Sequence, residues 1–247
     1  MKVNTTHLNQ PGTETFALRL KRSTRKVHSM AEQTTFIRGF LRGTADLHSY
    51  LQLLTDFLHV YTRMESEWER LLQTGEPALS QFTFRELFRS KTLLKDIAFI
   101  LDHQIGLSYP TPTSAASDYA KRIQEVSRGQ EPHRLIGHLY TRYMGDLSGG
   151  QILAKIAHKS LGLDAGAGLD FYEFKEIPDI SVAKDAFRTA MNQSVDGLKE
   201  KENAVTDEAI RAFRYNIQIF ETLSGSAWKT LLRNLPGCSH RIQPKAA

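Results

Sequence analysis

The sequence predicts an all-α protein with a single domain, and three observations support this fold class. Apolar residues recur three and four positions apart along almost the whole chain, which is the spacing of one helix face. Only residues 171–174 have a strand-like composition, and that stretch is too short to begin a sheet. The chain also lacks an internal repeat and a long linker. We therefore expect one bundle of about eight helices.

The first three helices are predicted at residues 14–32, 36–41 and 47–74. The third is the clearest, because Asp46 is a good N-cap and the Gly75 turn ends it. Its apolar stripe consists of Leu47, Tyr50, Leu51, Leu54, Phe57, Leu58, Tyr61, Met64 and Trp68. Such a stripe predicts a long amphipathic helix with one buried face.

The rest of the chain is predicted to form further helices at about 84–103, 113–128, 133–161, 179–196 and 206–233. The breakers between them are Gly106, the Pro110–Pro112 turn, Gly129 and the Gly162–Gly168 stretch. We expect residues 14–235 to form the domain, with a flexible extension at 1–13 and a flexible tail at 236–247.

The composition is that of an ordinary soluble globular protein. The 247 residues are 40% hydrophobic and 24% charged, which excludes a collagenous, disordered or membrane-embedded chain. No apolar run reaches the ~18 residues of a membrane span, and the N-terminal residues lack the apolar core of a secretory signal. We therefore expect a cytoplasmic protein without a membrane attachment, and we expect it to be a monomer.

The single cysteine and the positive charge restrict the partners. Because Cys238 has no second cysteine, an intramolecular disulfide and a thiolate metal cluster are excluded. The formal net charge is +5, yet none of the recognised nucleic-acid-binding motifs is present, so we expect no nucleic-acid partner. This charge is better suited to anionic small molecules or to an acidic protein.

The most unusual local sequence interrupts a helical pattern with three glycines, and it reads Tyr140-Thr-Arg-Tyr-Met-Gly-Asp-Leu-Ser-Gly-Gly-Gln151. Each glycine costs about 0.5–1 kcal/mol in a helix relative to alanine. Gly145 and Gly149 are four positions apart and share one face, so either a flat or bulky group lies against them or the helix bends there. Close packing against another helix through small residues is the alternative explanation.

Asp146 lies between these glycines in an otherwise apolar stretch. A partly buried carboxylate needs hydrogen-bond partners or ordered water. One interpretation is structural, with Asp146 as a cap or as the ion-pair partner of Arg142 four positions earlier. The other interpretation is functional, with a carboxylate that positions water beside a bound ligand.

A second group of polar residues lies on the first predicted helix and consists of Lys21, Arg25, His28 and Glu32. Offsets of four, seven and eleven positions place all four on one face. His28 is about 10 Å along the helix axis from Lys21, which is close to the distance from a porphyrin centre to its carboxylate edge. A neutral imidazole ligates iron, cations pair with propionates, and a carboxylate four positions later accepts the second imidazole N–H. The alternative is a solvated surface without a ligand.

Two shorter patterns are less informative. Lys184 and Arg188 are four positions apart on a later helix, where such a pair commonly forms a solvated face. Asp56 and His59 resemble half of a dinuclear iron site, but that chemistry needs the motif twice and two further carboxylates. Because no second copy is present, we interpret Asp56 and His59 as a structural pair.

Taken together, these segments resemble the heme oxygenase family. The resemblance depends on the glycine-rich segment, which continues as Ile152-Leu-Ala-Lys-Ile-Ala157, and on Lys26-Val-His-Ser-Met-Ala-Glu32. Supporting stretches are Phe171-Tyr-Glu-Phe174, Phe187-Arg-Thr-Ala-Met-Asn192 and Ala212-Phe-Arg-Tyr-Asn-Ile-Gln-Ile-Phe220. The likeness covers roughly residues 14–223 in the same order, and it is closest to the bacterial and cyanobacterial type without a membrane anchor.

The resemblance implies both a fold and a reaction. The fold is a helical bundle that holds heme between a proximal helix and a kinked distal helix. In the reaction, heme b is cofactor and substrate at once. O₂ and externally supplied electrons convert it to biliverdin, with the IX-alpha isomer expected, and to CO and Fe²⁺.

The same resemblance implies roles for individual residues. His28 corresponds to the proximal iron ligand, and Glu32 corresponds to the carboxylate that supports it. Asp146 corresponds to the carboxylate that orders distal water and delivers a proton, beside the distal glycines Gly145 and Gly149. The remaining positions are Lys21, Arg25, Lys184 and Arg188 around the propionates, Tyr140 near that edge, Gly150 in the distal motif, and Tyr61, Phe213 and Asn216 in the pocket or its water network.

The electrons for this reaction must come from another protein. One cysteine excludes an iron–sulfur cluster, and no Gly-x-Gly-x-x-Gly turn follows a strand. We expect an acidic donor of the ferredoxin or flavodoxin type, or a reductase.

Two other classes of protein remain open at this point. One is a heme carrier that does not degrade heme, and Asp146 with the distal glycines argues against it. The other is a helical hydrolase of thiamin metabolism, which would need a cysteine nucleophile in the core, whereas Cys238 lies near the C-terminus.

Overall fold

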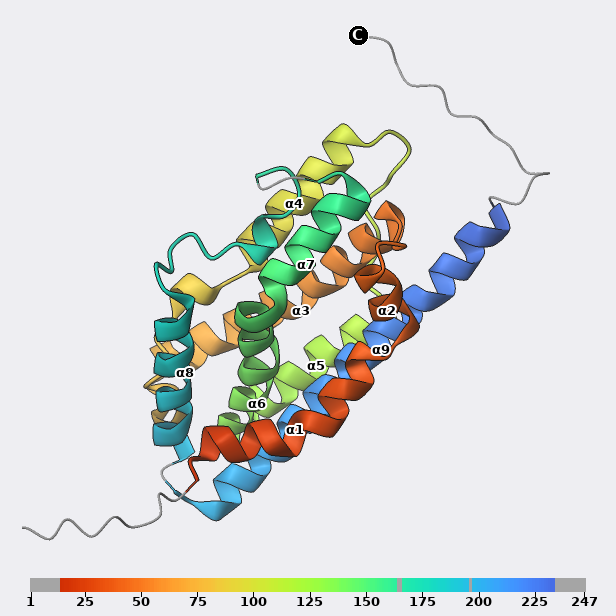
Figure 1. Cartoon of the computed structure of the whole chain (residues 1–247). Coiled ribbons are helices and arrows are strands. Elements are labelled where there is room, and N and C mark those ends of the chain that lie inside the picture. The colour runs from red at the N-terminus through yellow and green to blue at the C-terminus, as the bar shows by residue number, and fades with distance from the viewer. Residues whose placement is uncertain (1–13, 164–165, 196, 234–247) are drawn as a thin grey trace, which may run out of the picture.

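The structure is a computed structural model that describes residues 14–163, 166–195 and 197–233 (Figure 1). The α-helices are α1 (Phe16–Glu32), α2 (Thr35–Leu41), α3 (Leu47–Gln73), α4 (Ser90–His103), α5 (Ser114–Arg128), α6 (Leu135–Leu139), α7 (Gly145–Leu161), α8 (Ile180–Val195) and α9 (Lys199–Arg233). The short turns are η1 (Pro77–Leu79), η2 (Arg85–Leu87), η3 (Pro132–Arg134), η4 (Tyr140–Met144) and η5 (Asp170–Tyr172). No strand is present in the described ranges, so the all-α fold class is confirmed.

The segments predicted to be flexible, 1–13 and 236–247, lie outside the described residues, as does Cys238. In the part of the chain that is described, no helix has both the length and the apolarity to cross a membrane.

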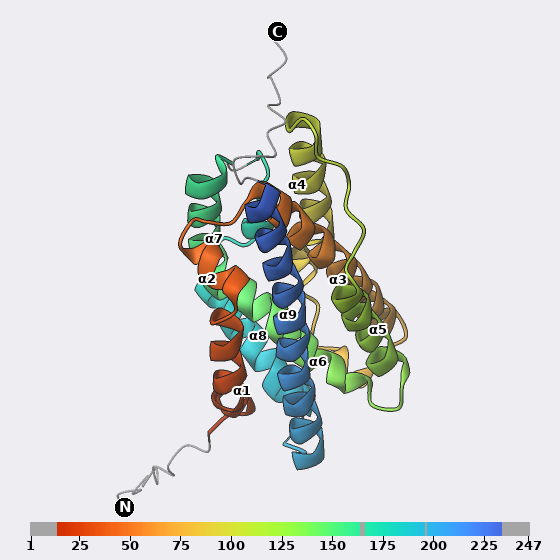
Figure 2. The ribbon, with the colours of Figure 1, turned by 90° about the vertical axis from the view of Figure 1, so that its right-hand side faces the viewer.

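The helices form a bundle whose core is centred on α3. This helix packs against α4 and α5, while α9 packs against α1, α5 and α6. Figure 2 shows α1 and α9 running side by side, with α3, α4 and α5 on the other side of the bundle. Tyr50, Tyr61 and Trp68 of α3 are completely buried. The apolar stripe predicted for the third helix therefore forms the centre of the core.

The two ends of α3 confirm the signals in the sequence. Asp46 Oδ1 accepts a hydrogen bond from the Ser49 N–H at 2.9 Å, and Oδ2 accepts one from the Ser49 hydroxyl at 2.8 Å. Beyond Gln73 the chain turns at Gly75, whose φ of 73° lies in the left-handed region that glycine adopts at little cost. Local chemistry therefore determines where this helix begins and ends.

The helix predicted at 133–161 is divided by a π-helical turn. The turn spans Tyr140–Met144, between α6 and α7, and Figure 1 shows that α7 continues from it in a new direction. The chain therefore changes direction at this turn, immediately before Gly145. Within the turn, the Thr141 hydroxyl donates to the Gly137 carbonyl at 2.9 Å.

Two helix boundaries predicted from the sequence are wrong. The helix predicted from residue 84 begins at Ser90, because the buried Glu65 carboxylate of α3 accepts hydrogen bonds from backbone N–H groups at the start of α4, including that of Ser90 at 3.1 Å. The last helix begins at Lys199 instead of 206; its first residues, 199–203, are all polar, so no apolar spacing indicates a helix there. Residues 171–174 form no strand, in agreement with the all-α prediction; Phe171 and Tyr172 belong to a 3₁₀ turn and are buried.

Asp56 is structural, as predicted, but its main partner is Thr113 instead of His59. Its carboxylate accepts hydrogen bonds from the Thr113 N–H and hydroxyl, both at 2.8 Å, and so fastens the start of α5 to α3. Burial raises the pKa of Asp56, although the Thr113 bonds oppose the rise. Among the described residues, no group of three or more His, Cys, Asp or Glu side chains could hold a metal ion.

A glycine that the sequence analysis did not single out sets the distance between α6 and α9. A Cβ placed on Gly137 would lie 2.7 Å from the Ala209 nitrogen and 2.8 Å from the Val205 carbonyl oxygen. Side chains do not tolerate such distances to backbone, so this close approach requires glycine. The contact holds α6, which leads into the π turn, against the helix that bears Phe213 and Asn216.

Candidate active site

One cavity brings together seven residues that the sequence predicts for the site. It has a volume of about 280 Å³ and is bordered by α1, α2, α3, α7, α9 and the turns η4 and η5. Most of its lining is apolar, with aromatic rings from α2, α3, η5 and α9. The predicted residues that line it are His28, Glu32, Gly145, Asp146, Gly149, Phe213 and Asn216.

His28 enters the cavity from the C-terminal half of α1. Its ring meets the Phe213 ring edge-on, with centroids 5.5 Å apart and planes at 76°. Its Nδ1 atom lies 3.7 Å from Glu32 Oε1, which is too long for a hydrogen bond but close enough for an ion pair. Because 54% of the His28 side chain is exposed, the imidazole is accessible to a ligand.

Asp146 belongs to a hydrogen-bonded network of four side chains. The Tyr61 hydroxyl donates to Asp146 Oδ2, and Arg142 Nε donates to the Tyr61 oxygen at 3.0 Å. Arg142 Nη1 donates to Asn216 Oδ1 at 2.8 Å, and Arg142 Nη2 lies 3.5 Å from Asp146 Oδ1. Burial raises the pKa of Asp146, while the charge of Arg142 and the bond from Tyr61 oppose the rise. The ion pair with Arg142 is present, and the same carboxylate lines the cavity.

Arg142 is central to this network, although its position in the sequence indicates only an ion-pair partner for Asp146. It is 7% exposed, and its guanidinium carbon lies 4.0 Å from the centre of the Phe57 ring. A buried guanidinium requires several partners, and Arg142 has them on three different helices. The signal that could have identified it is a charged residue inside a stretch that is otherwise apolar.

Gly145 and Gly149 border open space. A Cβ placed on either glycine would meet no atom within 4 Å, and both residues line the cavity. Close packing between helices is therefore the wrong explanation for these two positions. Gly150 differs, because its Cβ would lie 3.7 Å from the Tyr172 carbonyl oxygen, and it is not among the residues that line the cavity.

Alanine substitutions at Gly137 and Gly149 should distinguish a glycine that the fold requires from one that only borders the cavity. Gly137→Ala pushes a methyl group into the α9 backbone and should lower the free energy of unfolding by about 1–3 kcal/mol. Gly149→Ala adds a methyl group in open space and should leave that free energy unchanged or raise it by up to about 1 kcal/mol. Urea unfolding of both variants and the wild type measures the difference. Equal destabilisation by the two substitutions would contradict this geometry.

Besides Gly150 and Tyr61, five other predicted residues do not line the cavity, namely Lys21, Arg25, Tyr140, Lys184 and Arg188. Lys21 and Arg25 are exposed on α1, and the cations of α8 are half-buried on a helix that packs against α1. The Tyr140 hydroxyl lies 3.3 Å from the Thr24 hydroxyl of α1. Burial raises the pKa of Tyr140, and the charge of Arg188 acts in the opposite direction. The structure therefore places Tyr140 within electrostatic range of Arg188 and in contact with α1.

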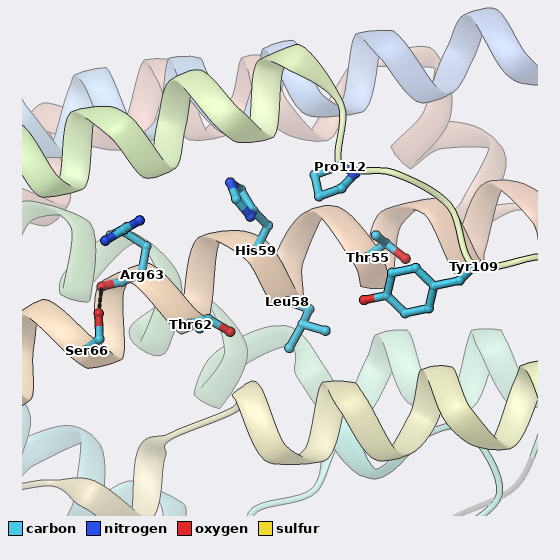
Figure 3. Close-up of a pocket in the computed structure, with 8 residues that line it drawn as sticks. All are labelled: Thr55, Leu58, His59, Thr62, Arg63, Ser66, Tyr109 and Pro112. Carbon is cyan, nitrogen blue, oxygen red and sulfur yellow. Dashed lines mark hydrogen bonds between the residues drawn. The ribbon is translucent and has the colours of Figure 1, made fainter.

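A second cavity lies along α3, beside the connection between α4 and α5 (Figure 3). Its volume is about 360 Å³. None of the residues predicted to bind heme lines it, and Figure 3 shows Tyr109 beside Thr55 at one end of the lining residues. The first cavity is therefore the candidate site. The second is lined by Thr55, Leu58, His59, Thr62, Arg63, Ser66, Tyr109 and Pro112.

Comparisons with known proteins identify the family of this chain. A family model described as heme oxygenase matches residues 14–222. Heme oxygenase 1 of the cyanobacterium Nostoc is 39% identical over 222 residues, which covers 87% of this chain and 88% of the relative. The crystal structure of heme oxygenase-1 from Synechocystis in complex with heme matches with a TM-score of 0.80 at 36% identity, covering 88% of this chain and 96% of that one. The heme oxygenase structure from Leptospira interrogans matches with a TM-score of 0.76 at 37% identity, covering 85% and 100% of the two chains. With its sequence matched from the first helix into the last and its fold shared with these structures, the chain belongs to the heme oxygenase family.

Proposed function

We propose that this chain binds heme in the cavity lined by α1 and α7 and opens the ring oxidatively. O₂ is the co-substrate, another protein supplies the electrons, and the products are biliverdin, CO and Fe²⁺. The observation that supports this proposal is one apolar cavity lined by His28 from α1 and by Gly145, Asp146 and Gly149 from α7.

The residues of the cavity fit heme b. The accessible imidazole of His28 is a good ligand for iron. The open space beside Gly145 and Gly149 admits a flat ring close to the helix backbone. Rings such as Phe57, and the aliphatic side chains around them, exclude water from an apolar ligand.

Different side chains are assigned to heme binding and to proton transfer. When bound, heme supplies the iron at which O₂ is reduced. His28 holds the iron, and Glu32 accepts the second imidazole N–H after a small side-chain movement from its present 3.7 Å. Asp146 holds water in the cavity and passes a proton through it, while Tyr61 and Arg142 fix the carboxylate. A pKa of Asp146 raised by burial suits a group that both accepts and releases protons.

The heme-loaded protein, given a reductant and O₂, should yield biliverdin IX-alpha as the main product. The in-plane orientation of the ring follows from where its propionates are anchored, and we assign that role to the cations Lys21, Arg25, Lys184 and Arg188. Chromatography against the four biliverdin isomers decides the outcome. A main product of the beta or delta type would show a ring rotated in its plane. Heme that binds but stays intact would indicate a carrier instead of an enzyme.

We further propose that the electron donor is an acidic ferredoxin-type protein that docks on the basic side of α1. Lys21, Arg22, Arg25 and Lys26 are all exposed there, and complementary charge steers a transient encounter. The rate of ferredoxin-driven turnover should therefore fall as the ionic strength rises past about 0.1 M, where the screening length is about 10 Å.

A charge reversal at Lys26 tests the docking without touching a residue assigned to heme. Lys26→Glu should slow turnover at low salt severalfold, whereas Lys91→Glu on the exposed side of α4 should not. Heme affinity is measured in parallel for both variants. A rate that does not depend on salt, with the heme site saturated, would contradict electrostatic docking.

A further inference from the structure

The segment between α7 and α8 has little regular structure, yet it forms part of the cavity. Residues 166–175, which we call the wall segment, have the 3₁₀ turn Asp170–Tyr172 as their helical structure. Phe171 and Tyr172 are buried and line the cavity. Because an irregular segment cannot pair all its backbone groups internally, its position depends on partners from elsewhere in the fold.

Asp96 of α4 is the partner of the wall segment. Its Oδ1 atom accepts a hydrogen bond from the Asp170 N–H at 2.8 Å, and its Oδ2 atom accepts one from the Phe171 N–H at 2.7 Å. The side chain is completely buried beside core residues of α4, Leu93 and Ile97. Burial raises the pKa of Asp96 to about 6, against the effect of the two N–H groups. Burying a carboxylate costs more free energy than burying an apolar side chain. The hydrogen bonds from the two N–H groups offset this cost and explain why a carboxylate occupies the position.

Asp170 attaches the same segment to α4 through its side chain. The carboxylate accepts hydrogen bonds from Lys95 of α4, from Lys175 at 3.1 Å and from the Gly166 N–H at 3.1 Å. Burial alone would raise the pKa of Asp170, but the two lysines lower it below its ordinary value. Lys95 and Asp96 are neighbours in the sequence, so a single turn of α4 holds the wall segment at both its backbone and its side chain.

The wall segment in turn contacts the network around Asp146. The Phe171 ring meets the Tyr61 ring edge-on, with centroids 5.7 Å apart, and lies 5.9 Å from the Phe57 ring. Tyr61 is the residue whose hydroxyl donates to the Asp146 carboxylate. A displacement of Phe171 would therefore remove the support on one side of Tyr61 and allow Asp146 to move.

We infer that Asp96 is a positioning residue for heme degradation. By holding the amides of Asp170 and Phe171, it fixes Phe171 against Tyr61 and so determines where the Asp146 carboxylate lies. Asp96 does not line the cavity, so it acts only through the wall segment. This inference rests on the proposed function, because the carboxylate that it places is the one assigned to proton transfer.

Asp96→Asn tests the inference, because the amide preserves the shape but presents a donor to one of the two N–H groups. In the heme-free protein, the Asp170 and Phe171 amides should exchange with solvent at least about tenfold faster. In the heme-saturated protein, well below the unfolding temperature, turnover should fall about tenfold while heme affinity stays unchanged. Asp102→Asn, at an exposed position of the same helix, is the matched control and should change neither quantity.

A milder variant covers the case in which Asp96→Asn does not fold. Lys175→Met removes a partner of Asp170 at a side chain that is 64% exposed, so the core is untouched. The Gly166 and Asp170 amides should exchange faster, and turnover should fall by a smaller factor than for Asp96→Asn.

Three outcomes would overturn the inference. Unchanged exchange in Asp96→Asn would show that Asp96 does not hold the wall segment. Faster exchange with unchanged turnover would show that the segment does not position the reacting groups. A wild-type protein that binds heme but never degrades it would contradict the proposed function as well, which distinguishes that failure from the other two.

Discussion

Replacement of His28 by alanine should abolish the ligation of heme iron by the protein. The imidazole is accessible in the cavity and makes no short hydrogen bond to Glu32, so the variant should fold normally. The absorption spectrum of a histidine-ligated heme should be lost, and turnover should fall at least about 100-fold. Added imidazole should restore the spectrum, because a free ligand can enter the space left by the side chain. Heme titration followed by absorption and resonance Raman spectroscopy measures the effect.

His59→Ala is the matched control for this experiment. His59 also lies on a helix and is half-buried, but it lines the second cavity and not the candidate site. Its removal should leave the heme spectrum and the turnover unchanged. A His28→Ala protein with the wild-type spectrum would refute the assignment of the iron ligand.

Replacement of Asp146 by alanine or asparagine should stop ring opening while heme still binds. The carboxylate is held by Tyr61 and Arg142 and is assigned to water and proton transfer, not to the iron. Loss of a positioned proton-transfer group lowers rates by about 10²–10⁴-fold, and a fall of that size is expected in biliverdin formation. Heme affinity and the ligation by His28 should be retained. Single-turnover measurements of heme loss and of biliverdin formation separate the two properties.

Two further substitutions serve as comparisons for Asp146→Ala. Tyr61→Phe removes one hydrogen bond to the carboxylate but leaves the carboxylate in place, so it should slow biliverdin formation less than Asp146→Ala does. Asp118→Asn, at an exposed position of α5, should have no effect. Normal biliverdin yield from Asp146→Ala would contradict the role in proton transfer.

The parts of the fold that were predictable are those that local chemistry determines. Asp46 and Gly75 delimit α3 through interactions within a few residues of the chain, and both were recognised from the residue type alone. The start of α4 was not predictable in this way, because the groups that cap it belong to Glu65 of another helix. The first turns of α9 were missed for a related reason, since Glu202 is held there by Arg19 of α1 and not by an apolar stripe.

The site residues also fall into two groups, those that a local sequence pattern identifies and those that it does not. His28 and Asp146 stand in unusual local sequences, so a residue pattern and a family resemblance were sufficient to select them. Arg142, Phe171 and Tyr172 have roles that depend on residues far away in the chain, and no local pattern revealed that they border the same cavity. The glycines show the limit most clearly. The local sequence does not distinguish Gly137 from Gly145 and Gly149. In the structure, however, Gly145 and Gly149 border open space, whereas Gly137 lies against the backbone of α9.

The fold class, the family resemblance and the residues proposed for the chemistry were all predictable from the sequence. Helix periodicity, caps and a specific motif are properties of short stretches of sequence, so they can be recognised without knowledge of the tertiary structure. Three features emerge from the folded structure: which helix faces meet around a cavity, the π turn ahead of Gly145, and the network in which Arg142, Tyr61 and Asn216 join Asp146. Local sequence patterns do not reveal these features, because burial and hydrogen bonding depend on distances between helices, and those distances follow from the packing of the whole bundle.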